Sequence, residues 1–222
     1  MNLDRPNYYK YFFISIIVIL IDQTVKMLVH FNMHLGEEIN VLGEWFRLHY
    51  VLNPGMAFGL EIGITNGKLI LTLFRLIAMV GIGYYLYILI KRRMHNGLLI
   101  SIALILGGAI GNVIDSTFYG VLLEGNAPLD AITPWFHGKV IDMLYFPLIS
   151  GVIPDWVPFW GGDSFQFFRP VFNIADSSIF IGVAMILAMQ KKFFAEEEKN
   201  NDLEAEISDI ELESLDGDIK KV

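Results

Sequence analysis

The chain has 222 residues, of which 54% are apolar and 18% charged, whereas an average soluble domain has about 45–50% apolar and about 25% charged residues. This composition predicts a membrane protein. Acidic residues outnumber basic ones by 24 to 16, but the excess lies in residues 195–222, and residues 1–194 are formally neutral. No basic stripe is present for nucleic acid to follow, so we expect no nucleic-acid partner. The absence of cysteine excludes a thiol nucleophile, a disulfide and a cysteine-bound metal.

Four stretches are apolar over the roughly 20 residues that a membrane helix needs, and they are residues 11–29, 68–90, 97–118 and 171–190. Basic residues precede the first stretch, join the second to the third and follow the fourth. Because short cytoplasmic loops are rich in lysine and arginine, we expect both termini to be cytoplasmic. We also expect one membrane domain over residues 1–194, followed by an acidic cytoplasmic tail.

The outer segments, about 30–67 and 119–170, have a different composition. Residues 39–60 are rich in β-branched and aromatic side chains and contain the turn sequence Asn53-Pro54-Gly55. Such a pattern is typical of a small sheet or a curved hairpin. The sequence therefore predicts a four-helix membrane protein with a small outer β-structure.

Ionisable residues inside membrane helices are costly and usually face a partner or a watery cavity. Asp22 and Lys26 are spaced i, i+4, which favours a structural ion pair within one helix. Arg75 lies near the outer end of its span, where snorkelling toward lipid headgroups explains it. Asn112 and Asp115 share a helix face, and helix packing does not explain them.

Two further carboxylates have a structural and a functional interpretation. Asp142 lies within the second outer segment and by itself resembles a solvated loop carboxylate. Asp176 lies in an apolar helix start, where either it or Asn173 can serve as the helix N-cap. If the two carboxylates face each other, like charges prevent both from ionising, and the pair can hydrolyse an amide as acid and base.

Other catalytic chemistries lack their sequence patterns. The histidines form no HExxH and have no carboxylate in ligand register, so we expect no zinc site and no other cofactor. No Ser-x-x-Lys or Gly-x-Ser-x-Gly occurs, which leaves Ser177 and Ser178 without an activating base. Carboxylates are the remaining candidates.

Five short motifs in order along residues 15–190 resemble those of the lipoprotein signal peptidases, or signal peptidase II. They are Asp22-Gln23 with Lys26, Asn53-Pro54-Gly55-Met56-Ala57-Phe58-Gly59, Gly108 with Gly111-Asn112-Val113-Ile114-Asp115, Val140-Ile141-Asp142, and Phe172-Asn173-Ile174-Ala175-Asp176-Ser177-Ser178. Any one of them is weak evidence, whereas five on four predicted spans are specific.

The resemblance implies an aspartic peptidase of the bacterial inner membrane, with its active site near the periplasmic face. Its substrates would be diacylglyceryl-modified prolipoproteins, cut just before the lipidated cysteine. It would work among membrane lipids and as a monomer. The family architecture has four membrane helices, an outer β-cradle and an interfacial helix or flap.

Residue roles also follow from the resemblance. Asp142 and Asp176 match the catalytic aspartates, and Asn53 and Gly55 match residues expected to hold the substrate backbone. The residues that match those shaping or supporting the site are Asp22, Lys26, Gly108, Asn112, Asp115, Asn173 and Ala175.

The sequence departs from the family pattern in two respects. Most members have arginine directly after the GNxxD aspartate, where this chain has Ser116; Arg75 and Arg169 are candidate substitutes. The outer segment is also long, with insertions at 121–138 and 143–170 that we expect to form a flap or lid. The acidic tail has no counterpart in the family pattern.

An alternative function is a small proton-coupled transporter or channel component in which Asp22, Asp115 and Asp176 act as a proton relay. The predicted carboxylates cluster at one depth, and the sequence contains no paired broken helices or inverted repeats, which transporters often have. The peptidase hypothesis is therefore favoured.

Overall fold

The computed structural model describes residues 8–55, 67–129, 131–147, 149–167 and 170–193. Four of its helices are long and apolar enough to cross a membrane. They are α1 (Tyr8–Asn32), α2 (Gly67–Lys91), α3 (Asn96–Ile114) with its continuation to Leu122, and the 174–193 helix (Ile174–Phe193). The predicted spans are confirmed. The predictions for Met56 to Gly59, Arg169 and the tail fall outside the described residues.

The 174–193 helix begins later than the sequence predicts. Val171 and Phe172 form the short strand β6, which pairs with β3. The side-chain oxygen of Asn173 accepts a hydrogen bond of 2.8 Å from the backbone N–H of Asp176. Of the two N-cap candidates, Asn173 is therefore the residue that caps the helix.

Helix α3 is the central helix of the bundle. In an apolar stretch of 18 residues of this helix and its continuation 56% of the residues are buried, whereas in the corresponding stretches of the other three spans only 17–22% are buried. Two of its glycines face neighbouring helices. A Cβ on Gly107 would lie 2.8 Å from Cβ of Val18 in α1, and a Cβ on Gly108 would lie 2.3 Å from the carbonyl oxygen of Ala175 in the 174–193 helix. Close approach of α1 and of the 174–193 helix to α3 therefore depends on these glycines.

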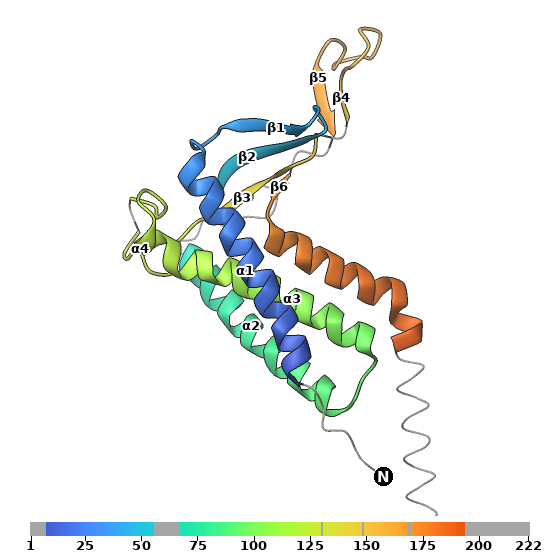
Figure 1. Ribbon diagram of the computed structural model, residues 1–222. Helices are drawn as coiled ribbons and strands as arrows, with labels where there is room; N and C mark the ends of the chain where they lie inside the picture. The colour runs from blue at the N-terminus through green and yellow to red at the C-terminus, as the bar shows by residue number, and fades with distance from the viewer. Residues whose placement is uncertain (1–7, 56–66, 130, 148, 168–169, 194–222) are drawn as a thin grey trace, which may run out of the picture.

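Helix α3 continues into one π-helical turn, η1 (Asp115–Tyr119), and the three-residue helix α4 (Gly120–Leu122). The wider turn lies at the end of the bundle where the sheet is found (Figure 1). Asp115, Ser116 and Tyr119 in this turn are all buried. Turns of this kind are frequent at functional sites.

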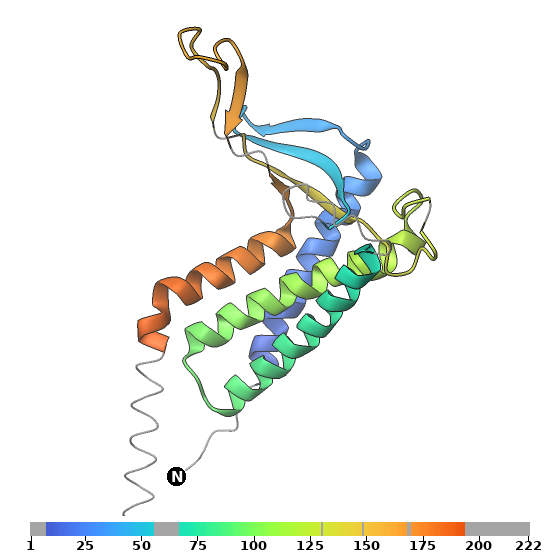
Figure 2. The same ribbon diagram turned by 180° about the vertical axis from the view of Figure 1, so that it is seen from behind.

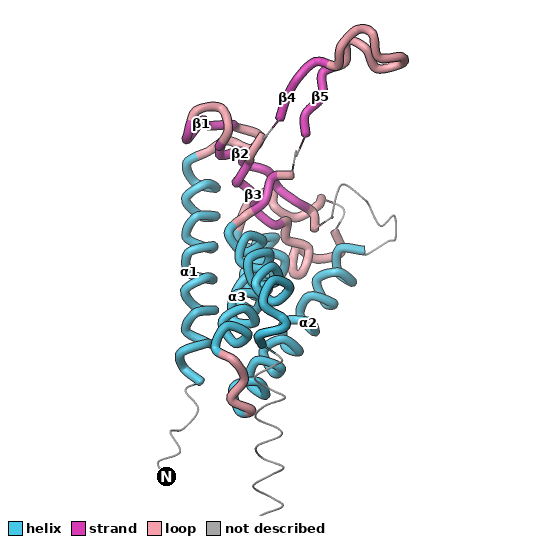
Figure 3. Tube along the Cα trace, turned by 90° about the vertical axis from the view of Figure 1, so that its right-hand side faces the viewer, coloured by secondary structure: helices cyan, strands magenta, loops and turns pink. Residues whose placement is uncertain are grey.

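The described residues contain six strands, which lie at the same end of the bundle as η1 (Figure 1). Four of them form an antiparallel sheet in the order β1-β2-β3-β6, and the other two form a separate hairpin, β4–β5, that projects away from the helices (Figures 1 and 3). The strands are β1 (Glu38–Leu42), β2 (Phe46–Asn53), β3 (Val140–Tyr145), β4 (Ile149–Val152), β5 (Ser164–Phe167) and β6 (Val171–Phe172). The sheet predicted for residues 39–60 is confirmed in its described part.

The two insertions differ in structure. The second supplies the end of β3 and the β4–β5 hairpin, where a flap or lid was predicted. The first begins within α4, and its described residues beyond Leu122 form neither a strand nor a further helix.

Strand β3 is held in place by a hydrophobic cluster beneath the sheet. Ile141 and Met143 are fully buried and belong to a cluster with Val29 of α1, Met33 just after the end of α1, and Tyr119 of η1. Asp142 lies between these two anchors, so its backbone position is fixed by packing on either side.

Candidate active site

The Asp142 carboxylate is positioned by two asparagine side chains. It is 2% exposed. Asn53 Nδ2 donates to its Oδ2 at 2.9 Å, and Asn173 Nδ2 donates to its Oδ1 at 2.7 Å. Asn53 ends β2, and Asn173 precedes the 174–193 helix. Three separate segments therefore meet at this carboxylate.

Asp176 lies in the first turn of the 174–193 helix and is half-buried. Asn112 Nδ2 of α3 donates to its Oδ1 at 2.7 Å. Asn173 contacts both carboxyl residues, because its Nδ2 donates to Asp142 while its Oδ1 accepts from the backbone N–H of Asp176. The structure thus brings together the two carboxylates that the sequence singled out.

The protonation of Asp142 reflects its surroundings. Burial, followed by the negative charge of Asp176, raises the pKa of the Asp142 carboxyl to about 7, and these effects outweigh the opposing hydrogen bonds from Asn53 and Asn173. A carboxyl that keeps its proton near neutral pH beside a second carboxylate can act as an acid while its neighbour acts as a base.

A buried ionic cluster lies directly beneath this pair. Lys26 Nζ is 2.7 Å from Asp22 Oδ2 and 2.7 Å from Asp115 Oδ2, and all three side chains are fully buried. The predicted i, i+4 ion pair is confirmed, and Asp115 joins it from α3. Lys26 also donates to Asn112 Oδ1 at 3.2 Å. Asn112 therefore connects the cluster to Asp176.

The same cluster holds the backbone next to each candidate catalytic residue. Asp22 Oδ1 accepts from the N–H of Ala175 at 2.8 Å, one residue before Asp176. Asp115 Oδ2 accepts from the N–H of Ile141 at 3.4 Å, one residue before Asp142. The positions of both carboxylates are thereby coupled to one set of buried charges.

Gln23 completes the cluster, although sequence reasoning gave it no separate role. Its Nε2 donates to Asp115 Oδ1 at 2.9 Å and to Asp22 Oδ2 at 3.1 Å, and Tyr119 donates to its Oε1 at 2.8 Å. A glutamine beside an acid in a helix carries no signal that would reveal such a network.

The sequence offers two explanations for Arg75, snorkelling toward the headgroups or replacement of the arginine that most family members have at position 116. The contacts favour the second, because the Arg75 guanidinium donates to Ser116 Oγ at 3.0 Å and makes a long contact of 3.5 Å to the carbonyl oxygen of Gly55. Gly55 has a positive φ of 95°, and its N–H donates to Asn53 Oδ1 at 2.8 Å. Arg75 thus links α2 to η1 and to the turn that carries Asn53.

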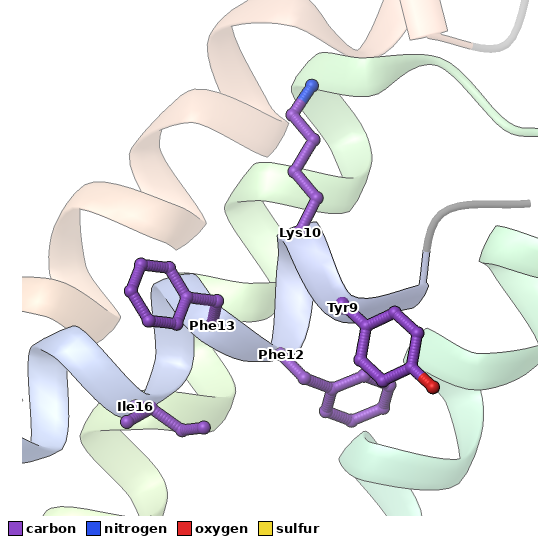
Figure 4. Close-up of a pocket in the computed structure, with 5 residues that line it drawn as sticks. All are labelled: Tyr9, Lys10, Phe12, Phe13 and Ile16. Atoms are coloured by element: carbon purple, nitrogen blue, oxygen red, sulfur yellow. The ribbon is translucent and has the colours of Figure 1, made fainter.

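The described residues contain no group of three or more histidine, aspartate or glutamate side chains able to hold a metal ion. Figure 4 shows a shallow apolar pocket at the start of α1, lined by Tyr9, Lys10, Phe12, Phe13 and Ile16. It contains no carboxylate and lies at the end of α1 away from the sheet (Figures 1 and 4). The polar cluster under the sheet is therefore the candidate active site.

Comparisons with known proteins identify the family of the chain. Residues 14–191 match the model of a family described as "Signal peptidase (SPase) II". A lipoprotein signal peptidase of Porphyromonas gingivalis is 47% identical and covers 78% of each chain. One from Amoebophilus asiaticus is 45% identical over 92% of this chain and 86% of its own. None of these relatives is named as a transporter.

Two solved structures described as bacterial membrane enzymes are also similar. One has a TM-score of 0.57 and 25% identity and covers 82% of this chain and 93% of its own. The other has a TM-score of 0.53 and 27% identity, covering 83% and 89%. Sequence and fold agree, and the chain belongs to the signal peptidase II family.

Proposed function

We propose that Asp142 and Asp176 are the catalytic pair of this chain, which as a signal peptidase II removes signal peptides from prolipoproteins. The observation that carries this proposal is the hydrogen-bonded bridge through Asn173, which holds a buried and a half-buried carboxyl in one site. The proposed substrates are diacylglyceryl-modified prolipoproteins, cut just before the lipidated cysteine.

The reaction needs one proton on the pair. We assign it to Asp142, whose pKa of about 7 keeps it mostly protonated in mildly acidic solution and in part protonated at neutral pH. Ionised Asp176 then takes a proton from water as the water oxygen attacks the scissile carbonyl carbon. Asp142 donates its proton to the nitrogen of the scissile amide as the C–N bond breaks, and the two products are a carboxylic acid and an amine. Proton exchange with solvent restores the pair.

The remaining residues of the site act through this pair. Asn53, Asn112 and Asn173 are positioning residues, since each donates directly to Asp142 or Asp176. We propose that the turn at Gly55 lies along the substrate backbone. Asp22, Lys26 and Asp115, together with the close contact of Gly108 with Ala175, set the position of strand β3, which carries Asp142, relative to the helix that carries Asp176.

The charge pattern supports one orientation in the inner membrane. The start of α1, the basic turn between α2 and α3 and the end of the 174–193 helix lie at one end of the bundle, and the sheet lies at the other (Figures 1 and 2). Lysine and arginine favour the cytoplasmic side. We therefore propose cytoplasmic termini, a periplasmic active site and a monomer whose substrates enter from the surrounding lipid.

The test is processing by single aspartate variants. In cells that lack their own enzyme, Asp142→Asn and Asp176→Asn should leave prolipoprotein uncleaved, with cleavage of a lipidated precursor in vitro reduced at least about 1000-fold. Asp163→Asn is the matched control, because Asp163 is exposed in the loop between β4 and β5, and it should cleave normally.

A precursor with the same sequence but without lipid tests the substrate class and should be cut far more slowly. Normal processing by either active-site variant would refute the catalytic assignment. Equal cleavage of both precursors would refute the lipid requirement.

A further inference from the structure

Two cationic side chains of α2 lie against the turn beside the active site. Lys68 and Arg75 are seven residues apart, or two helical turns, so they share a face of the helix. A Cβ built on Gly55 would lie 3.2 Å from Lys68 Nζ and 3.3 Å from Arg75 Nη1. Both side chains therefore reach the same point on the segment that carries Asn53.

Neither cation is matched by a carboxylate within the described part of the chain. Lys68 Nζ is buried and has no hydrogen-bond partner, and neither residue forms an ion pair within 4.0 Å among the described residues. Arg75 uses Nη1 for Ser116 and makes only the long contact to Gly55. A guanidinium has five N–H donors and an ammonium three, so several donors are available.

Lys26 cannot supply these donors to a substrate. It is fully buried between two carboxylates at 2.7 Å each. In contrast, the acids with the strongest electrostatic influence on Arg75 are Asp176, Asp115 and Asp142, in that order. The charge of Arg75 therefore acts on the candidate catalytic pair, although it makes no ion pair with either member.

A buried ammonium without an acceptor is costly, and a ligand that brings oxygen acceptors would remove this cost. We propose that Lys68 and Arg75 form a subsite that binds a carbonyl oxygen of the lipidated peptide beside the scissile bond. This inference rests on the proposed function. Where the bound oxygen is that of the scissile carbonyl, the cations also stabilise the negative charge that develops on it during attack by water.

Two carbonyl sources fit the subsite, namely the peptide backbone and the ester groups of the diacylglyceryl moiety. A matched pair of substrates separates them: the same peptide carrying either a diacylglyceryl or a dialkylglyceryl group, because the ether analogue lacks the ester carbonyls. Arg75→Gln and Lys68→Met are assayed with both. Lys91→Met is the control, since Lys91 lies exposed at the other end of the same helix.

We expect kcat/KM to fall about 10- to 100-fold in Arg75→Gln and Lys68→Met and to stay unchanged in Lys91→Met. An equal fall with both substrates assigns the subsite to a backbone carbonyl, and a fall with the diester alone assigns it to the ester groups. Values within twofold of wild type for both variants and both substrates would overturn the proposal.

Moving the guanidinium from position 75 to position 116 tests whether Arg75 acts by binding the substrate or by packing. Ser116 Oγ lies 3.0 Å from Arg75 Nη1, so an arginine at position 116 can place its guanidinium in the same region. The double change Arg75→Ser with Ser116→Arg should recover most of the activity that Arg75→Ser loses. Equal loss in the single and double variants would mean that Arg75 acts by packing and would overturn the proposal.

The outcome also distinguishes this subsite from the proposed function itself. If wild type cleaves the lipidated precursor and Asp142→Asn does not, the proposed function holds whatever the α2 variants do. If Asp142→Asn cleaves normally, the proposed function fails irrespective of Lys68 and Arg75.

Discussion

Replacing Lys26 by methionine tests the role of the buried charges most directly. The change removes an ammonium that lies 2.7 Å from both Asp22 and Asp115 but keeps most of the side-chain volume. Two fully buried carboxylates would then face each other without a cation. Breaking a buried ion pair in this way costs about 3–5 kcal/mol, so we expect a loss of this size in the free energy of unfolding.

The assay measures unfolding of the purified protein in detergent. Thermal and denaturant-induced transitions give the free energy of unfolding. Arg47→Met is the control, because Arg47 pairs with Glu38 at 3.1 Å while the two side chains are 28% and 38% exposed. Exposed pairs contribute about 0–1 kcal/mol. If Lys26→Met destabilises the protein no more than Arg47→Met does, the buried cluster is not a structural requirement.

A compensated variant shows whether the loss comes from unmatched charge. With Lys26→Met, the additional changes Asp22→Asn and Asp115→Asn remove both charges while keeping oxygens that accept from Ala175 and Ile141. We expect this triple variant to recover at least half of the lost stability. Recovery of stability with cleavage still impaired would show that the cluster also fixes the geometry of the catalytic pair.

Two further outcomes are expected from the same site. The pH profile of kcat/KM should be bell-shaped, with its alkaline limb near pH 7, because loss of the proton from Asp142 leaves the free enzyme without an acid. Cleavage assays from pH 4 to 9 check this, and a flat profile would contradict it. Gly108→Ala should abolish most cleavage, because the new Cβ would lie 2.3 Å from the carbonyl oxygen of Ala175. Gly81→Ala is the control. Its new Cβ would have nothing within 4 Å, so this variant should cleave like wild type. Equal activity of the two alanine variants would refute the close-packing argument.

Much of the fold could be predicted because lipid imposes simple requirements. Membrane helices must be long and apolar, so their spans are visible in one sequence. The Asp22–Lys26 pair also follows from helix periodicity alone. The pairing of Asp142 with Asp176 was implied by family motifs alone, whereas the pattern around Asp142 suggested a solvated loop and not the buried strand β3, because strand register depends on contacts that are distant in sequence.

Other features were not predictable for identifiable reasons. Asp22 accepts a hydrogen bond from Ala175, 153 residues later in the chain, and no local pattern encodes such a contact. Arg75 was expected to reach the headgroups because an isolated helix offers it no other polar partner. The π-helical turn changes the direction of the side chains after Asp115, and it brings Ser116 to Arg75.

The site therefore has two layers with different requirements. The lower layer, Asp22, Lys26 and Asp115, is fully buried, has one cation 2.7 Å from both acids, and holds the backbone next to each candidate catalytic residue. The upper layer, Asp142 and half-buried Asp176, lacks a cation in direct contact among the described residues, and its proton remains available for transfer. One lysine could not both hold the backbone and leave a proton on the catalytic pair. A cation in contact with Asp142 or Asp176 would favour the ionised form of that carboxyl group, and the acid would be lost. Asn53, Asn112 and Asn173 meet this requirement, since neutral amides orient the two carboxyl groups without adding charge.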